Sequence, residues 1–239
     1  MRRRNLLATM ATLPLLAHAN PNTRPKLALI MDDLGYRERD SYAALELPGE
    51  LTLAILPHTQ HSEALAQGAA AFGHEVMLHL PMEATNGKFL GVGGLQLDMS
   101  GLEFEQLIAA AFESVPGARG FNNHMGSAFS QSPGAMAKVM MEGRKYSDYY
   151  IDSLTHSASV GAKIARLMGL KAATRDVFID DANDYLSIPQ RIETLGRRRD
   201  EPATIAICHP FPETITALQD AWGWMNDRFE LVPASEIVS

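Results

Sequence analysis

Short hydrophobic runs recur along the chain, and most of them end in polar residues. The first, at 26–31, reads Lys-Leu-Ala-Leu-Ile-Met and is followed by Asp32 and Asp33. Runs that are apolar at successive positions are typical of parallel strands buried on both faces. We therefore expect strands at 26–31, 51–56, 75–80, 120–123, 149–152, 170–174, 203–208 and 231–233.

Amphipathic segments separate these runs. Residues 103–113 repeat apolar side chains at Phe104, Leu107 and Ile108, which is the period of a helix buried on one face. Residues 133–143 begin with proline and end with glycine, a favourable start and stop for a helix. The expected helices lie at 62–72, 103–113, 133–143, 157–168, 188–195 and 212–225.

Alternation of strands and helices predicts the α/β class, with parallel strands joined by right-handed crossovers. The number of repeats fits one barrel-like domain over 26–239. One segment interrupts the pattern, because 83–99 carries four glycines and has no clear period. A long loop directly after a strand is where barrels place substrate contacts.

The first nineteen residues have the features of a secretory signal peptide. Three arginines precede an apolar stretch at 6–16, and Ala17-His18-Ala19 matches a cleavage site. We expect cleavage after Ala19, a short leader at 20–25, and a periplasmic or secreted mature chain without a transmembrane segment. The alternative is an uncleaved membrane anchor.

The amino-acid composition excludes several classes of protein. The 239 residues are 46% hydrophobic, with a mean hydropathy of −0.09, which excludes a polytopic membrane protein. The net charge of −7, with no basic patch beyond 197–199, argues against a nucleic-acid partner. A single cysteine excludes an intramolecular disulfide and a multi-cysteine metal cluster.

Residues suited to chemistry collect at the carboxyl ends of the expected strands. Asp32 and Asp33 follow the first strand, and His209 follows the strand at 203–208. Because the carboxyl ends of parallel strands converge on one face of a barrel, we expect these side chains to lie together. His58, His79, Asn122, Asn123, His124 and Asp152 occupy the same kind of position.

The combination of carboxylates and imidazoles suits a catalytic metal. One carboxylate of the Asp32–Asp33 pair can bind an ion while the other takes a proton from water. His79 and His124 would complete an Asp/His/His set with open positions for water and substrate, and Glu83 is a further candidate ligand. The competing structural roles are a helix cap for the aspartates, a core histidine at His79 and a turn around His124.

His209 suits a general acid, because the ordinary pKa of histidine is near neutral. Its competing role is a strand-terminal histidine that donates to a neighbouring carbonyl. An acidic partner would raise the pKa of His209 and fix its tautomer, and Asp152, Asp176, Asp180 and Asp181 are all candidates. The residues expected to contact substrate or support the ligands are His58, Glu83, Asn123, Asp152, Asp176 and Asp180.

Several of these segments together resemble the divergent polysaccharide deacetylase family, exported relatives of the NodB-type carbohydrate esterases. The resemblance covers residues 25–236. It rests on Met31-Asp32-Asp33-Leu34-Gly35, Leu56-Pro57-His58, His79-Leu80-Pro81-Met82-Glu83, Asn122-Asn123-His124-Met125-Gly126-Ser127, Arg175-Asp176-Val177-Phe178-Ile179-Asp180 and His209-Pro210.

This resemblance implies a NodB-like distorted (β/α)7 barrel and metal-dependent removal of N- or O-acetyl groups. It also implies that Asp32 is the catalytic base, Asp33 the metal-binding aspartate, His79 the first metal histidine and His209 the acid. Two features depart from the family pattern. The second metal histidine is replaced by Glu83, and an Arg-x-Pro motif after the fourth strand is missing.

These inferences predict an exported metal-dependent hydrolase that removes acetyl groups from a cell-envelope glycan, cutting an ester or a non-peptide carbon–nitrogen bond. Its expected substrate is a polysaccharide or a peptidoglycan-like polymer. The expected cofactor is a divalent metal, with zinc as the first choice and cobalt, nickel or iron as alternatives. Two alternatives remain: a non-catalytic envelope protein that binds a glycan or a protein partner, and a hydrolase of cell-wall peptide amides.

Overall fold

A computed structural model describes residues 24–99, 101–181 and 187–239. The expected signal peptide at 1–19 and most of the leader at 20–25 lie outside these residues.

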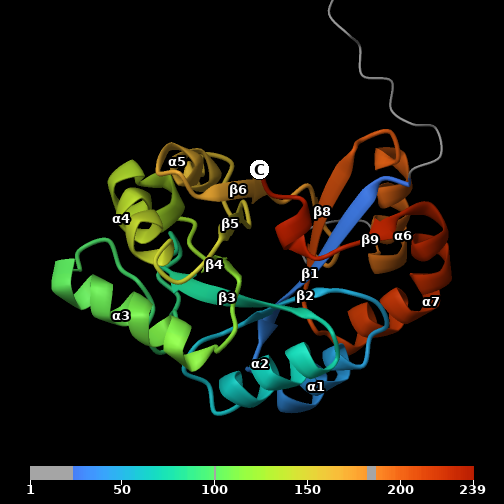
Figure 1. The fold of residues 1–239 in the computed structure, drawn as a ribbon, viewed down its shortest axis with the longest axis horizontal. Coiled ribbons are helices and arrows are strands. Elements are labelled where there is room, and N and C mark those ends of the chain that lie inside the picture. The colour runs from blue at the N-terminus through green and yellow to red at the C-terminus, as the bar shows by residue number, and fades with distance from the viewer. Residues whose placement is uncertain (1–23, 100, 182–186) are drawn as a thin grey trace, which may run out of the picture.

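A curled parallel sheet forms the centre of the molecule (Figure 1). Its strands run in the order β6-β5-β4-β3-β2-β1-β8-β7, and the short β9 pairs with β1 on the side. The α/β barrel-like fold expected from the sequence is therefore confirmed, with β6 and β7 at the two ends of the strand order. The strands are β1 (Lys26–Leu34), β2 (Thr52–Ile55), β3 (Glu75–Met82), β4 (Gly120–Met125), β5 (Tyr149–Asp152), β6 (Lys171–Thr174), β7 (Val177–Phe178), β8 (Ala203–Cys208) and β9 (Glu230–Leu231).

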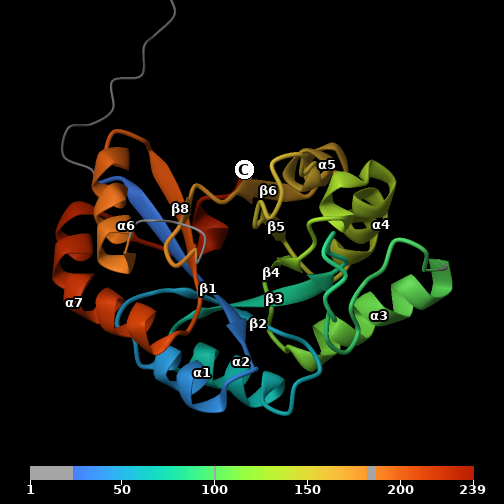
Figure 2. The same ribbon diagram turned by 180° about the vertical axis from the view of Figure 1, so that it is seen from behind.

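Helices cover the outside of the sheet, as the front and back views show (Figures 1 and 2). Helix α1 was not expected, because its short, polar sequence buries only Ser41, Ala44 and Leu45. The helices are α1 (Glu38–Leu45), α2 (Ser62–Ala71), α3 (Gly101–Ser114), α4 (Pro133–Gly143), α5 (Gly161–Leu167), α6 (Ile188–Leu195) and α7 (Pro212–Arg228), with 3-10 turns η1 (Phe129–Gln131), η2 (Gly196–Arg198) and η3 (Ala234–Glu236).

Alternate residues of each strand serve two separate apolar layers. In β1, Leu27 and Leu29 pack outward under the helices, whereas Ala28 and Ile30 pack inward against Met77 and other side chains from β5 and β8. This is the two-residue period of a strand buried on both faces.

The C-terminal segment closes the amino-terminal end of the barrel. Ala234 joins the inner apolar layer, and its backbone N–H donates to Thr52 Oγ1 at 2.9 Å. The carbonyl of Ser239 accepts from the N–H of Ala172 on β6 at 3.3 Å. One end of the interior is filled in this way, and the polar side chains described below lie at the opposite end.

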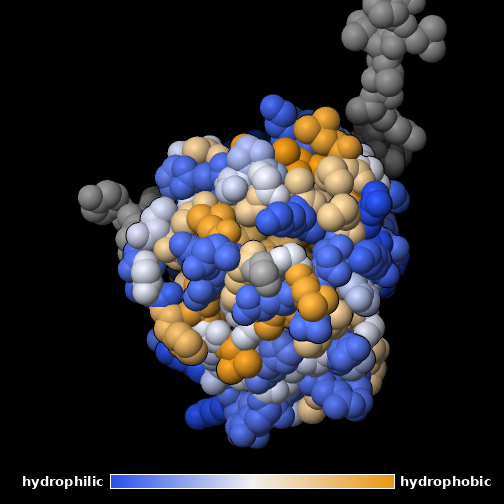
Figure 3. Space-filling view, turned by 90° about the vertical axis from the view of Figure 1, so that its left-hand side faces the viewer, coloured by the Kyte–Doolittle hydropathy of each residue, from blue (hydrophilic) through white to orange (hydrophobic). Residues whose placement is uncertain are grey.

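Within the described ranges, no helix is both long and apolar enough to cross a bilayer. On the face beside α3, hydrophobic residues are scattered among hydrophilic ones (Figure 3). Single exposed apolar side chains of this kind are normal for a protein surface.

Candidate metal centre and active site

Strand alternation brings the polar residues together at the carboxyl end of the barrel. Asp32 is the next inward position after Ile30, and His209 follows Ile207 in the same way. His79 pairs in register with Asn122, and His124 lies two residues further along the same face of β4. The interior therefore has an apolar layer, with these polar side chains above it at the carboxyl end.

Asp33 reaches the same place by a different route. Simple alternation would direct its side chain away from Asp32, but its backbone adopts a left-handed conformation with φ of 61°. The register between β1 and β2 also shifts between Met31 and Leu34. Aspartate tolerates this conformation better than most residues, and such strain recurs at functional sites. Both carboxylates consequently face the interior.

Asp33, His79 and His124 form a compact cluster of ligand atoms. Asp33 Oδ1 lies 2.9 Å from His79 Nε2 and 2.8 Å from His124 Nδ1, and the two nitrogens are 3.2 Å apart. In a tetrahedral site with bonds of about 2.0–2.1 Å, neighbouring ligand atoms lie about 3.4 Å apart. The donor set and its spacing thus fit zinc or a similar divalent ion.

Asn122 fixes the tautomer of His79. Its amide Nδ2 donates to Asp32 Oδ1 at 2.7 Å, so its Oδ1 is left to accept from His79 Nδ1 at 2.6 Å. A neutral His79 then presents the lone pair of Nε2 to Asp33 and His124. A lone pair directed at a carboxylate oxygen needs a cation between them, either a proton or a metal ion.

The electrostatics of the cluster agree with that requirement. Burial acts to lower the pKa of His79, but the charge of Asp32 and the contact with Asp33 outweigh it, so the pKa lies above its ordinary value. Burial also opposes ionisation of Asp33, yet hydrogen bonds from His124 and His79 hold its pKa well below the usual range. Both pKa shifts are those expected of a site that favours a positive charge among these side chains.

The Nε2 of His124 is buried and has no hydrogen-bond partner among the described residues. The tautomer of His124 is therefore not fixed by a protein group in the way that Asn122 fixes His79.

Asp32 lies beside the cluster rather than in it. Its Oδ1 is 3.7 Å from His79 Nδ1, and its side chain is almost fully buried. Burial raises the pKa of Asp32 above its ordinary value. A carboxylate with a raised pKa is a better proton acceptor near neutral pH than an exposed one.

His209 also lies beside the cluster and is held by Asp180. Its Nε2 is 3.8 Å from Asp33 Oδ2, while its Nδ1 donates to Asp180 Oδ1 at 3.0 Å. The backbone N–H of His209 and the hydroxyl of Thr214 both donate to Asp180 Oδ2. Burial acts to lower the pKa of His209, but Asp180 and Asp33 raise it to about 9. His209 is therefore protonated at neutral pH in the metal-free protein.

Among the four acidic candidates, Asp180 thus contacts His209, and two others have separate partners. Asp152 accepts from Ser159 Oγ at 2.7 Å and from the N–H of Ala162, at the start of α5. Asp176 accepts from Arg198 at 2.6 Å.

Two further residues that were expected near the substrate hold loops in place. Asn123 Oδ1 accepts from Tyr150 Oη at 2.8 Å and from the N–H of Ser153 at 3.0 Å. Glu83 Oε2 accepts from the N–H of Leu97 at 2.8 Å, which ties the two ends of the 83–99 loop together. The second histidine at the cluster is accordingly His124, and the carboxylate of Glu83 is engaged with the loop.

One cavity of about 330 Å³ contains Asp32, the three clustered residues and His209, with Asp181 also in its lining. Arg175 lines it too, with Nε donating to the carbonyl of Ser153 at 2.8 Å and the guanidinium 4.7 Å above the ring centre of Phe178. His58 lies outside this cavity, in a neighbouring one described below.

Three residues of this region were given no role from the sequence: Asn122, Thr214 and Arg175. Asn122 could have been identified from the alternation of side chains along β4. Its side chain lies on the same face of the strand as that of His124, whereas the side chain of Asn123 lies on the other face. Arg175 follows β6 at the carboxyl end, as the selected residues follow their strands. Thr214 lies within α7, where no sequence pattern marks its hydroxyl.

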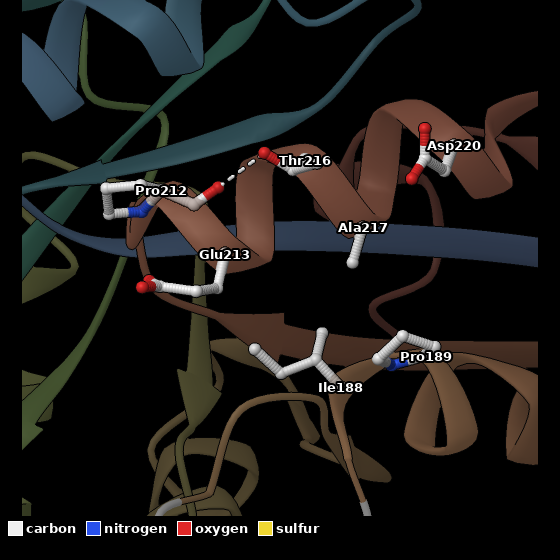
Figure 4. A pocket seen from close by; sticks show the side chains of 7 residues that line it. All are labelled: Ile188, Pro189, Pro212, Glu213, Thr216, Ala217 and Asp220. Carbon is white, nitrogen blue, oxygen red and sulfur yellow. Dashed lines mark hydrogen bonds between the residues drawn. The ribbon is translucent and has the colours of Figure 1, made fainter.

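A larger cavity, of about 490 Å³, lies between α6 and α7 (Figure 4). Its lining contains Ile188, Ala217 and two carboxylates, Glu213 and Asp220, on different turns of α7. It has no histidine and no converging set of polar groups, so it lacks the chemistry of the barrel-end cavity.

The comparisons with known proteins agree on one family. The sequence profile of a family described as divergent polysaccharide deacetylase matches residues 29–238. The chain is 37% identical over 240 residues to an uncharacterized protein, YibQ, of Escherichia coli, covering 99% of this chain and 74% of the relative. It is 33% identical to an uncharacterized protein of Haemophilus influenzae, over 87% of this chain and 74% of the relative.

Solved structures share the fold. An uncharacterized protein of Agrobacterium tumefaciens superimposes with a TM-score of 0.83, at 22% identity over 92% of each chain. A polysaccharide deacetylase of Bacillus cereus gives a TM-score of 0.54 at 14% identity, covering 89% of this chain and 94% of its own. A CE4 family pseudoenzyme of Bacillus anthracis gives 0.51 at 13% identity, covering 91% and 66%.

Proposed function

The chain belongs to the divergent polysaccharide deacetylase family, and from this premise we propose that it is an exported, metal-dependent hydrolase of acetyl groups on a cell-envelope glycan. One observation carries the proposal: one cavity contains a cluster of three candidate ligand residues together with a buried carboxylate, Asp32, and the imidazole of His209, which Asp180 holds. This is the arrangement that hydrolysis of an acetyl amide or ester requires.

Asp33, His79 and His124 would hold the ion, which we propose to be zinc. The chemistry that a divalent ion supplies in such a site is polarisation of the acetyl carbonyl and a lower pKa for a water molecule. Asn122 keeps the lone pair of His79 Nε2 directed at the cluster and at the same time orients Asp32. It thereby gives Asp32 a hydrogen-bond partner in a chain that lacks the family's arginine motif.

The remaining steps belong to two side chains beside the cluster, Asp32 and His209. Asp32 accepts the proton of the attacking water at its carboxylate. His209 donates the proton on Nε2 to the leaving nitrogen or oxygen, while Asp180 stabilises the imidazolium through Nδ1. Acetate and a free amine or hydroxyl on the sugar are the products.

The direct test uses the purified mature protein loaded with zinc: acetate release is measured on acetylated glycans, and release of free amino groups is measured on cell-wall peptides as a comparison. Release from the glycans alone supports the proposal. Release from the peptides alone would make the protein a hydrolase of cell-wall amides. A metal-loaded protein inert toward both would favour a glycan-binding or protein-binding role, which the fold of a pseudoenzyme makes a relevant alternative.

Replacing Asn122 by alanine should weaken zinc binding by about 10- to 100-fold while all three ligands remain, because His79 loses the partner that fixes its tautomer. Competition with a chelating dye measures the dissociation constant. Asn123→Ala is the matched control, since its amide contacts Tyr150 and the loop after β5 instead. Equal zinc affinity in wild type and Asn122→Ala would contradict the role given to Asn122.

Export is the remaining part of the proposal, supported by the arginine cluster, the apolar stretch at 6–16 and Ala17-His18-Ala19. N-terminal sequencing of the protein recovered from the periplasm should begin at Asn20. A membrane-bound product that begins at Met1 would instead indicate an uncleaved anchor.

A further inference from the structure

A second cavity borders the metal centre at the same end of the barrel. It has a volume of about 290 Å³ and is formed by the loop after β1, the loop after β2 and residues 89–92 of the loop after β3. Tyr36 lines it, and its ring meets the ring of His124 edge-on, with ring centres 6.0 Å apart. A group bound in this cavity would therefore lie next to a group bound at the cluster.

Close backbone contacts define the shape of this cavity. Gly91 has φ of +88°, and a Cβ there would lie 3.2 Å from Tyr36 Oη. Gly93 has φ of +76°, and a Cβ there would lie 2.8 Å from His58 Cδ2. Only glycine adopts these conformations without cost and leaves room for the two rings. The loop after β3 is thus fitted against Tyr36 and His58.

The same loop is fixed at its two ends. The N–H of Leu95 donates to the carbonyl of Pro81 at 2.8 Å, and the N–H of Glu83 donates to the carbonyl of Leu95 at 2.9 Å. The carboxylate of Glu83 adds the bond to Leu97 described above. The tip of the loop is consequently presented at a defined place above the barrel end.

Large apolar side chains are left exposed around this cavity. Phe89 is 84% exposed, Val92 66% and Tyr36 55%. Exposed apolar side chains grouped at a cavity on anchored loops are typical of a binding site. The lining also includes His58 and Gln60, and burial lowers the pKa of His58, which favours an uncharged ring at neutral pH. No acidic side chain, lysine or arginine is among the lining residues.

We propose that this cavity is a subsite for an uncharged sugar ring adjacent to the acetylated residue of the substrate, a proposal that rests on the function proposed above. A sugar ring has an apolar face of C–H groups, which can stack on Phe89 and Tyr36, and an edge of hydroxyls, which can bond to His58 and Gln60. The volume is at the small end of ligand cavities and suits one such ring. An anionic sugar would find no cationic side chain in the lining.

Binding is tested without turnover, in the full mature protein carrying His209→Ala. Calorimetry with a tetramer of N-acetylglucosamine should show binding that Phe89→Ala weakens roughly 5- to 20-fold, the effect of losing one stacking ring. Phe89→Tyr should retain the affinity. Phe72→Ala is the matched control, because Phe72 is similarly exposed but follows α2 at the other end of the barrel. A tetramer of galacturonic acid should bind more weakly than the neutral tetramer.

Kinetics in the wild-type background separate this subsite from the proposed function. Phe89→Ala should lower kcat/KM for the neutral tetramer roughly tenfold and leave it unchanged for p-nitrophenyl acetate, which has no sugar ring. If neither the wild type nor any variant released acetate, but Phe89→Ala still weakened tetramer binding, the proposed function would fail and the subsite would stand.

Two results would overturn the subsite. The first is tetramer affinity and kcat/KM that are equal in Phe89→Ala and wild type. The second is unchanged tetramer binding together with a change in oligomeric state of Phe89→Ala by ultracentrifugation, which would identify the patch as a contact between copies of the chain.

Discussion

Zinc bound by wild-type protein should fall from about one ion per chain to nearly none when His79 is replaced by alanine, and acetate release should fall to background. His79 contributes one of the three ligand atoms, and two ligands rarely retain a divalent ion against competition from water and buffer. Elemental analysis after gel filtration measures the metal content, and an acetate assay measures the activity.

A second measurement reports on the ion without turnover. With zinc at about 100 times its dissociation constant, binding stabilises the folded protein by about 2.7 kcal/mol. For a domain of this size that corresponds to a rise in Tm of about 5–10 °C. We expect this rise in wild type and in His156→Ala, a histidine outside the cluster, and none in His79→Ala. A zinc-dependent rise in Tm that survives in His79→Ala would place the ion elsewhere.

His209→Ala should reduce turnover by roughly 10²- to 10⁴-fold, the usual contribution of a positioned general acid, with zinc content nearly unchanged. The reason is geometric: His209 Nε2 faces Asp33 Oδ2 at 3.8 Å but is not part of the three-residue cluster. Asp180→Asn should lie between wild type and His209→Ala in turnover, because it removes the charge that keeps His209 protonated. In this variant the alkaline loss of activity should begin at lower pH.

Asp32→Asn is the companion variant, at the proposed base. It should keep its zinc and lose most of its turnover, because an amide cannot accept the proton of the attacking water at neutral pH. A protein that only binds glycan would behave differently: it would release no acetate in any form, and its glycan affinity would be indifferent to His209→Ala and Asp32→Asn. These two variants therefore separate a hydrolase from a binding protein.

Much of the fold could be predicted from the sequence because each strand segment carries its own local signal. The apolar run at 26–31 is typical of a strand with both faces buried, and it is the core of β1. The short helix α1 and the two-residue strand β7 were not predicted, since neither has enough apolar residues to show a period. Their positions depend on packing against elements that the local sequence does not reveal.

The candidate site was likewise predictable from the sequence only in part. The sequence by itself determined the residue types and their placement at strand ends: Asp32, His79 and His209 follow apolar runs whose carboxyl ends must meet in a parallel barrel. Those positions follow from a two-residue period and one direction of the strands, which are local properties of the chain.

Only the tertiary structure decided which of these side chains make contact. Asp33 turns inward through a backbone conformation that alternation does not predict. Asp180 rather than Asp152 or Asp176 meets His209, because β7 pairs with β8 in the register Phe178 to Ile207, which brings Asp180 beside His209. Asn122 on β4 contacts His79 on the neighbouring β3 and also Asp32 on β1, which is not adjacent to β4 in the sheet. Such contacts depend on the curvature of the sheet and on loop paths, which are fixed by packing over the whole domain and not by any single segment.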